Sequence, residues 1–407
     1  MKLLRVRIEG LKMFEDLFDF SFITKQNVTR LNSTSVHNIF NRIHAMNVVA
    51  LIGKNASGKT MELNLLIFVF RAFLHNQPLN HIDSKYALVG DEFLFKTNYF
   101  DEVHNMLYEL HSKIIKNEDG ELIFEEETIY SKKLTIKANK SNIFDLNDDS
   151  HVNVERRPAN SLLPEDNTYF RSITKKDNVE LTRVFDFSAF NNMNLLFSEM
   201  MDSYDTELQS AIITYLDPTI EYVHAFNQSP DSENKNDLLE VKFKRSDKVV
   251  RVNGIKIFNY LSAGTIKGVN LFNYAFNALR SGGFLIIDEI ENHFHRAIVQ
   301  TIISFFSDPR INKTHATLIF TTHYPQLLDT FDRNDDIYVS RRVDDKTYLD
   351  RFCDQIRRED IKKSDIYESG VLNGTSPMFE AYDKLRSVAV KVATVTDRDM
   401  ARKDGHK

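Results

Sequence analysis

The sequence lacks the features that mark secreted, membrane-inserted and filamentous proteins. Only one cysteine, Cys353, occurs in 407 residues, so no intrachain disulfide can form, and a reducing cytoplasm is the expected location. Charged side chains interrupt the apolar positions of residues 1–14, which excludes a signal peptide, and no uninterrupted apolar run is long enough to span a bilayer. We therefore expect a cytoplasmic protein that does not enter a membrane.

Longer patterns are also missing. No heptad pattern persists over the length that a long coiled coil requires, and no internal repeat is evident. The formal net charge of -6 argues against a protein coated in nucleic-acid-binding surface, although it leaves a local basic groove open. With 42% hydrophobic and 27% charged residues, the composition is that of a globular protein of one large or two moderate domains.

A glycine-rich loop is the strongest feature that the sequence does contain. It follows the apolar run 48–52, which predicts a buried strand, and precedes residues 61–74, which predict a helix. Gly53 and Gly58 let the backbone curl so that successive N–H groups point at a phosphate. These flanking elements disfavour the alternative of a glycine-rich turn that merely caps a helix. The predicted phosphate-binding loop consists of Gly53, Lys54, Asn55, Ala56, Ser57, Gly58, Lys59 and Thr60.

Two side chains at the end of this loop predict the ligand. The Lys59 ammonium is placed to reach the β- and γ-phosphates of ATP, and the Thr60 hydroxyl is placed to ligate Mg²⁺. ATP and Mg²⁺ are therefore the predicted cofactors.

A pair of acids follows another apolar run. Residues 284–287 predict a buried parallel strand, and Asp288 and Glu289 stand at its carboxyl end, where open α/β sheets bind ligands. Asp288 is expected to hold Mg²⁺ through water, and Glu289 to orient and deprotonate the attacking water. An apolar run that ends in two acids is common by itself. Downstream of a phosphate-binding loop, it indicates the magnesium-binding and catalytic acids of an ATPase.

Two further pieces complete the set of motifs. Residues 260–265, Tyr-Leu-Ser-Ala-Gly-Thr, precede the apolar helix predicted at 266–279. The apolar strand predicted at 317–323 ends in His323. A lone histidine at a strand end is more often structural, but beside the other motifs His323 is placed to sense the γ-phosphate.

Together these motifs resemble the ABC-type ATPase heads of the SMC, RecF and overcoming-lysogenization-defect proteins. The sequence most closely resembles the compact AAA-type ATPases of bacterial abortive-infection and other anti-phage systems, over residues 1–70 and 255–375. The resemblance implies an α/β fold, namely an ABC-type P-loop ATPase head with a mixed sheet, an antiparallel β subdomain and a mostly helical inserted lobe. It also implies ATP hydrolysis. It further implies a homodimer or higher homo-oligomer in which ATP is sandwiched, meaning that each ATP lies between the phosphate-binding loop of one subunit and the residues 262–264 of another.

The resemblance assigns roles to further residues. Ser262 and Gly264 would contact the γ-phosphate bound to the other subunit, and His323 would be the switch histidine. Glu291 and Asn292 would lie in the loop that communicates across the dimer.

Other residues limit the resemblance. Ala263 and Thr265 differ from the transporter-type signature, which disfavours the energising subunit of a membrane transporter. Gln77 is the candidate for the glutamine that senses the metal. Asp397 and Asp399 faintly resemble the paired aspartates of a Toprim nuclease domain, but the remaining chain is too short for one. Any nuclease activity should therefore reside in a separate effector protein.

The rest of the chain predicts four segments. The N-terminal half of the ATPase head is expected at 1–145, the mostly helical lobe at 146–237, the C-terminal half of the head at 238–375, and a C-terminal helix or tail at 376–407. The expected antiparallel strands are 3–8, 17–23, 92–100, 107–115, 122–130 and 134–137, with a turn at 117–120. Residues 147–176 are expected to be irregular. Residues 189–201 and 206–226 are expected to be helices, the second interrupted at Asp217 and Pro218. Residues 227–237 are expected to be a loop or disordered linker, and 238–244 with 249–252 a hairpin.

Two weaker signals have ordinary explanations. The two-residue spacing of His293 and His295 is poor geometry for one transition-metal ion. Basic residues on the hairpin at 238–252 could touch nucleic acid, but a solvated strand face is the commoner account. These basic residues are Lys242, Lys244, Arg245, Lys248 and Arg251.

Two classes of function remain open at this stage. In the first, the ATPase is a sensor or regulator in phage defence that holds or releases a separate toxic effector. In the second, it is a DNA-repair or recombination ATPase that clamps DNA, and the missing coiled coil and the acidic net charge count against that class.

Overall fold

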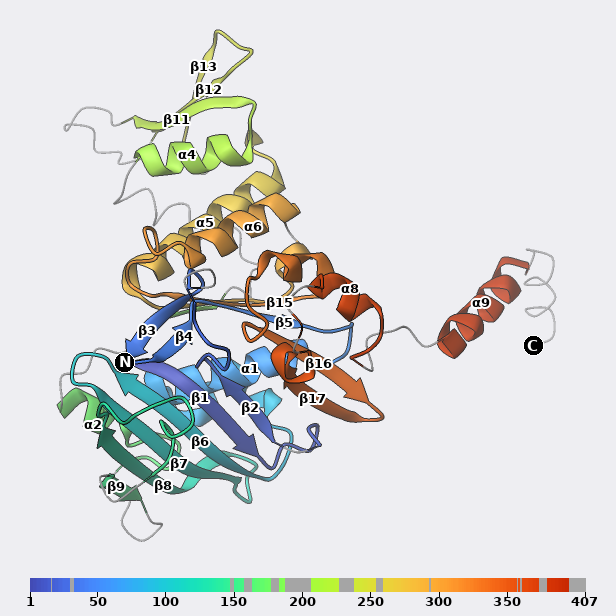
Figure 1. The fold of residues 1–407 in the computed structure, drawn as a ribbon. Helices are drawn as coiled ribbons and strands as arrows, with labels where there is room; N and C mark the ends of the chain where they lie inside the picture. The colour runs from blue at the N-terminus through green and yellow to red at the C-terminus, as the bar shows by residue number, and fades with distance from the viewer. Residues whose placement is uncertain are drawn as a thin grey trace.

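Two six-stranded sheets form the body of the molecule, and the helix after the glycine-rich loop lies between them (Figure 1). Both sheets combine strands that are far apart in the sequence. The computed structural model describes residues 1–15, 17–29, 33–146, 150–156, 163–176, 183–186, 206–226, 238–253, 259–292, 294–356, 358, 361–372 and 379–394.

The first sheet is mixed and contains the strand before the glycine-rich loop. That strand, β5 (Val48–Ile52), lies between β15 (Thr317–Thr322) and β16 (Ile337–Val343) and runs parallel to both. Strands β5 and β15 are buried along their whole length, as expected of parallel strands that are covered on both faces. The order is β10 (Val184–Asp186), β14 (Phe284–Ile287), β15, β5, β16, β17 (Lys346–Arg351), with β17 antiparallel to β16. The predicted mixed sheet is confirmed.

The second sheet is antiparallel throughout, as predicted for the β subdomain. Its hairpin turn at Gly120, where φ is +79°, joins two long strands. The strand expected at 134–137 is wrong, because the Ala138 N–H bonds the Thr135 carbonyl at 2.8 Å and closes a turn. The order is β2 (Phe18–Ser21), β1 (Lys2–Glu9), β6 (Glu92–Asp101), β7 (Met106–Lys116), β8 (Leu122–Lys133), β9 (His151–Arg156). Strand β9 lies in a stretch that was expected to be irregular.

Helices cover both faces of the mixed sheet. Alternate residues of β5 point to opposite layers: Val49 and Leu51 pack with α1 (Lys59–Val69), and Ala50 packs with α5 (Ala263–Ser281) and α6 (Arg296–Ser307). The other elements of the described chain are β3 (Val36–Phe40), β4 (Ile43–Met46), η1 (Phe70–Leu74), η2 (Leu79–His81), η3 (Asp83–Ala87), α2 (Phe170–Lys176), η6 (Ile290–Asn292), η7 (Pro325–Thr330), α7 (Phe352–Gln355), α8 (Lys363–Glu368) and α9 (Phe379–Thr394).

A small lobe stands on α5, at the top of Figure 1. Helix α4 (Thr206–Leu216) packs beside a three-stranded sheet of β11 (Ile220–Phe226), β12 (Leu238–Phe243) and β13 (Val249–Asn253). The helix expected through residue 226 is therefore wrong in its second half. The chain turns at 217–219 and β11 then pairs with β12, so a partner that is distant in the sequence overrides the local helical pattern.

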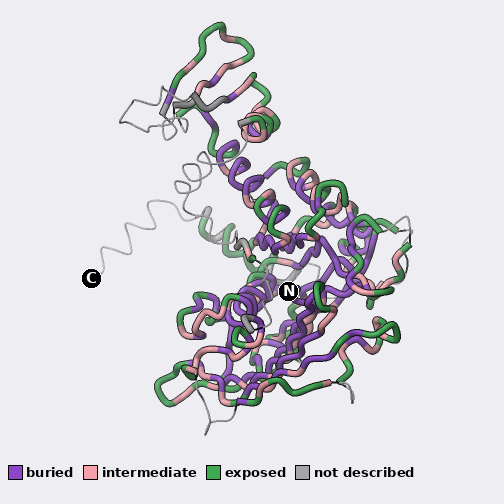
Figure 2. The backbone as a smooth tube through the Cα atoms, turned by 90° about the vertical axis from the view of Figure 1, so that its left-hand side faces the viewer, coloured by how far each residue is buried: buried purple, intermediate pink, exposed green. Residues whose placement is uncertain are grey.

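The described part of residues 146–237 mixes strands with helices, because β9 and β10 each join one of the two large sheets. The predicted helix at 189–201 and loop at 227–237 lie outside the described residues. Figure 2 shows that burial is concentrated in the body of the molecule, while the β12–β13 hairpin is mostly exposed or half-buried. No helix in the described part of the chain has the length and apolar character that crossing a membrane requires.

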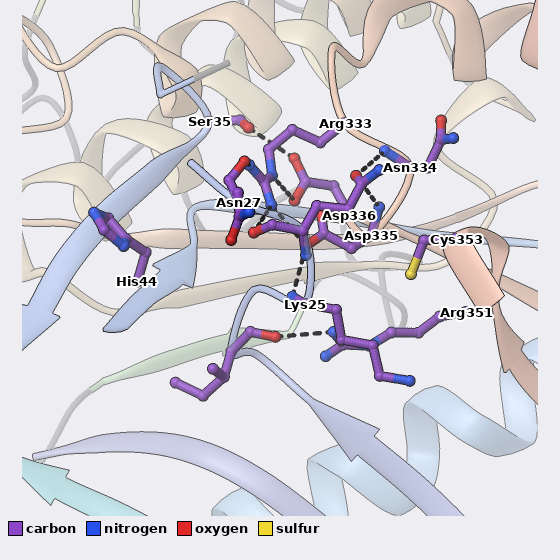
Figure 3. Close-up of polar contacts among 12 residues, drawn as sticks. Lys25, Asn27, Ser35, His44, Arg333, Asn334, Asp335, Asp336, Arg351 and Cys353 are labelled. Atoms are coloured by element: carbon purple, nitrogen blue, oxygen red, sulfur yellow. Dashed lines mark hydrogen bonds and ion pairs between the residues drawn. The ribbon is translucent and has the colours of Figure 1, made fainter. Parts of the chain in front are cut away.

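A fully buried ionic cluster lies just before β16 (Figure 3). The Arg333 side chain is 0% exposed, and its Nη2 donates to Asp335 Oδ2 at 2.6 Å. Asp335 Oδ2 also accepts from the backbone N–H of Lys25 at 2.7 Å, and Asp336 Oδ2 accepts from Ser35 Oγ at 2.7 Å. Burial, reinforced by the charge of Asp335, raises the pKa of Asp336 to about 7. The cluster ties residues 25–35 to the start of β16.

Candidate functional site

The predicted motifs meet at one edge of the mixed sheet. Strands β14, β15 and β5 are adjacent and parallel, so the segments that follow them lie side by side at their carboxyl ends. The phosphate-binding loop follows β5, the two acids follow β14, and His323 follows β15. This edge is the usual ligand site of an open α/β sheet.

The phosphate-binding loop has the tight, crowded backbone that its glycines predict. Gly58 has φ +120°, in the region that favours glycine, and a Cβ there would lie 2.8 Å from Thr347 Cγ2. A Cβ on Gly53 would lie 2.3 Å from Ser57 Oγ and 2.6 Å from the Ser340 carbonyl oxygen. The β16–β17 hairpin therefore forms one wall of the loop, and Ser340 Oγ donates to the Ser57 carbonyl at 3.1 Å.

The Lys59 amine is held inside the loop. Its Nζ donates to the carbonyl oxygens of Gly53 at 2.7 Å and Lys54 at 2.9 Å. Burial lowers the pKa of Lys59, and the negative charges of Glu289 and Asp288 offset part of that shift. Lys59 thus presents a cation at the loop centre, close to the two acids that the sequence singled out.

Three hydroxyl and carboxyl groups join the loops. Thr60 Oγ1 donates to Asp288 Oδ2 at 2.8 Å, and Thr321 Oγ1 donates to Asp288 Oδ1 at 2.5 Å. Thr60 and Asp288 therefore offer two adjacent hard oxygen ligands, which suit Mg²⁺. No group of three or more His, Cys, Asp or Glu side chains in the described chain could hold a metal ion.

Glu289 has a backbone conformation that few residues adopt. Its φ is +47°, and its N–H donates to Thr321 Oγ1 at 2.6 Å. A left-handed conformation at a residue other than glycine costs free energy and persists where the surroundings impose it. Here the hydroxyl of β15 fixes the turn directly after Asp288, and the Glu289 side chain stays half-buried at the sheet edge.

His323 is held by a carboxylate of its own chain. Glu291 Oε1 accepts from the His323 backbone N–H at 2.6 Å and lies 2.6 Å from His323 Nδ1, outside hydrogen-bond geometry. The Glu291 side chain is only 2% exposed, against 30% for His323. The Glu291 carboxylate is thus turned inward to β15, and the expectation that its loop communicates across a dimer stays a prediction. The role of Asn292 stays a prediction.

The predicted signature residues lie at the N-terminus of α5. Ser262 Oγ caps the helix by accepting from the Thr265 N–H at 3.0 Å, and Ser262 and Gly264 are both exposed. No hydrogen bond or ion pair of the described residues joins either of them to the phosphate-binding loop of the same chain. Their contact with nucleotide on a second subunit stays a prediction.

Some residues of the site were missed or misplaced by sequence reasoning. The residues that were missed are Thr321, Ser340 and Glu62, which contact or face the loops of the site. Only Glu62 could have been found from the sequence, because it is an acid three residues after Lys59 on a helix face whose remaining residues are apolar. Burial raises the pKa of Glu62 to about 8, and Ser340 and Lys59 offset part of the rise. Gln77 is misplaced: it follows the far end of the α1–η1 helix, about 20 Å along its axis from the loop.

One of the comparisons with known proteins identifies the family of this chain. No curated protein matches the chain. A solved structure of the recombination mediator protein RecF-ATPrS in the RecFOR pathway aligns with 86% of this chain and 98% of that chain, at 9% identity and a TM-score of 0.36, which is too low to support an argument. Residues 48–329 match the family model "AAA domain, putative AbiEii toxin, Type IV TA system". The chain therefore belongs to this family of AAA-domain ATPases.

Proposed function

We propose that the protein binds and hydrolyses ATP with Mg²⁺ and that its nucleotide state controls a separate toxic effector in anti-phage defence. The observation that carries the enzymatic part is the bonded set of Thr60, Asp288 and Thr321, which brings the phosphate-binding loop and the two acids to one point. Lys59 lies at the same point.

In this proposal each side chain has one task. Lys59 and the loop N–H groups hold the phosphates, and Thr60 and Asp288 hold Mg²⁺, which neutralises charge on the phosphates when it is bound. Glu289 takes a proton from the attacking water, and His323 contacts the γ-phosphate side from β15. Glu291 keeps the His323 backbone in place.

The exposed N-terminus of α5 supports a two-subunit site. In the described chain Ser262 and Gly264 are exposed and form no hydrogen bond or ion pair with their own phosphate-binding loop, and a second copy can bring them to the γ-phosphate. ATP then favours the closed dimer by its differential affinity for that state, and hydrolysis removes the group that both subunits share. The closing and opening of the dimer would be the signal to the effector.

The family's description supports a partner protein, because type IV toxin–antitoxin systems have two components. A cytoplasmic location suits this role. The wild-type protein should release phosphate from Mg-ATP in the steady state, and Lys59→Ala should abolish ATP binding because it removes the charge that holds the phosphates. The link to defence is tested by expressing the protein with the products of neighbouring genes and measuring growth. Growth that does not depend on Lys59 would refute control by nucleotide.

A DNA-clamping ATPase is the second candidate. The tip of the β12–β13 hairpin exposes Lys244, Arg245 and Lys248, while Lys242 pairs with Glu221 and Arg251 with Glu240. Three exposed cations supply a modest attraction for phosphates. Fluorescence anisotropy with labelled duplex DNA, with and without Mg-ATP, tests this candidate, and affinity that is unchanged after the three cations are replaced by serine argues against it.

A further inference from the structure

Glu62 has a buried carboxyl group that the described residues satisfy poorly. Its side chain lies on α1, the helix that the phosphate-binding loop begins, and is 0% exposed. Neither carboxyl oxygen forms a hydrogen bond of good geometry with a described residue, although the nearby Ser340 hydroxyl offsets part of the rise in the Glu62 pKa. Burying a polar group in this way is unfavourable, and an apolar side chain such as the neighbouring Leu63 or Leu66 would pack there without that cost.

Glu127 shows the ordinary arrangement of a buried carboxyl group. It is also 0% exposed, but it accepts hydrogen bonds from the Thr168 hydroxyl and from the Tyr169 backbone N–H, the latter at 2.7 Å. Buried carboxyl groups of this kind stabilise the local structure through their partners. Among the described residues Glu62 has no hydrogen bond of comparable geometry, so a purely structural role does not account for it.

The surroundings of Glu62 belong to the phosphate-binding loop. Lys59 lies one turn before it on the same buried helix face and bonds the start of the loop through Gly53. Ser340 bonds the end of the loop through the Ser57 carbonyl. Lys59 and Ser340 are the two side chains that act on the Glu62 carboxyl group. Ser57, a loop residue that is 4% exposed, has a buried Oγ without a hydrogen-bond partner among the described residues.

We propose that Glu62 is a positioning residue of the nucleotide site. Its carboxyl group shares the buried face of α1 with Lys59 and is close to Ser340, and its contacts with these two side chains, which hold the two ends of the loop, restrict where both can lie. Glu62 touches no phosphate and acts only through these neighbours. Buried groups that break a local rule of stability are expected at functional sites, where the arrangement serves a ligand. This inference rests on the proposed binding of ATP.

The test compares two substitutions at Glu62 with the same two at Glu127 in the full-length chain. The measurements are the affinity for a fluorescent ATP analogue with Mg²⁺ and the thermal midpoint. Glu62→Leu should bind the analogue about 10- to 100-fold more weakly, the loss typical of a lost second-layer contact, with a thermal midpoint at or above that of the wild type. Glu62→Gln keeps a polar group and should stay within about threefold of the wild type.

The control variants should show the opposite pattern. Glu127→Leu leaves two donors without their acceptor, so it should lower the thermal midpoint while the folded protein keeps its affinity. Wild-type affinity in Glu62→Leu would overturn the inference, and so would equal losses in Glu62→Leu and Glu62→Gln. A wild-type protein that binds no analogue would instead overturn the proposed function, which the Lys59→Ala variant examines separately.

Discussion

Charged side chains at the two ends of the mixed sheet differ in their burial and in their partners. At the carboxyl ends of β5 and β14, Thr60 is exposed and Asp288 and Glu289 are half-buried, so their oxygens can reach a ligand. At the opposite edge, before β16, Arg333 and Asp335 are completely buried and bond the neighbouring backbone. Charges inside a protein need partners in the chain itself, whereas charges at a binding site must keep room for another partner.

This comparison predicts that substitutions at the two ends change different quantities. At the carboxyl ends they should change the handling of ATP and leave unfolding unchanged. Before β16 they should change unfolding and leave the handling of ATP unchanged. Any variant that changes both quantities breaks the comparison.

The largest effect is expected from Glu289→Gln. The substitution removes the base that accepts the proton of the attacking water but keeps the shape of the side chain, so steady-state phosphate release should fall about 100-fold or more. ATP binding and the thermal midpoint should stay as in the wild type. Phosphate release at the wild-type rate would show that Glu289 is not the base.

Arg333→Ala should have the largest effect on stability. It leaves Asp335 and Asp336 buried without their cation, which should cost about 3–5 kcal/mol in the free energy of unfolding. Urea denaturation measures this loss, and the folded fraction should bind ATP normally. Lys25→Ala is the matched control, because its side-chain pair with Asp354 is exposed and should contribute less than about 1 kcal/mol.

The third prediction concerns a second subunit, which should complete the ATP site at the carboxyl ends of the strands. In a Glu289→Gln background with excess Mg-ATP, light scattering should show enrichment of the closed dimer. The added change Ser262→Arg should remove that enrichment without preventing ATP binding, because it places a large side chain at the exposed start of α5. If the oligomer is constitutive, crosslinking between cysteines introduced at Ser262 and at the exposed loop residue Asn55 should rise with ATP. Crosslinking that does not respond to bound nucleotide contradicts the sandwich.

The smallest effect concerns pH. The pKa of Asp336 is raised to about 7 in the folded protein, above its ordinary value of 3.8, so the folded state binds this proton more tightly than the unfolded state. The contribution of Asp336 to stability is therefore present at acidic pH and is lost as pH rises through about 7. Asp336→Asn should make the free energy of unfolding less dependent on pH between 5 and 8.

Asp308→Asn is the control for this pH dependence. The hydrogen bond from Arg310 lowers the pKa of Asp308 to about 2, so any contribution of this group is lost only in strong acid. Its replacement should leave the change in stability between pH 5 and 8 as it is in the wild type. Equal pH dependence in Asp336→Asn and the wild type would refute the assignment to Asp336.

Sequence reasoning succeeded where one stretch of chain determines its own structure. The apolar runs of β5, β14 and β15 are bounded by turns, so they predicted three strands, of which β14 was expected to be parallel, and the glycines of the loop predicted its tight backbone. It failed for residues 219–226, where pairing with β12 decides the structure. It also could not place Thr321 or Ser340, because their contacts depend on which strands become neighbours.

The order of strands around β5 has a consequence for synthesis. β5 ends at Ile52, but the strands on its two sides begin at Thr317 and Ile337. During synthesis, both edges of β5 stay unpaired until β15 and β16 have left the ribosome, when most of the protein has been made. Pairing between strands so distant in the sequence forms slowly. A chain that stops before Thr317 contains every residue of the phosphate-binding loop but no sheet to hold it. Finished molecules alone should be able to bind ATP.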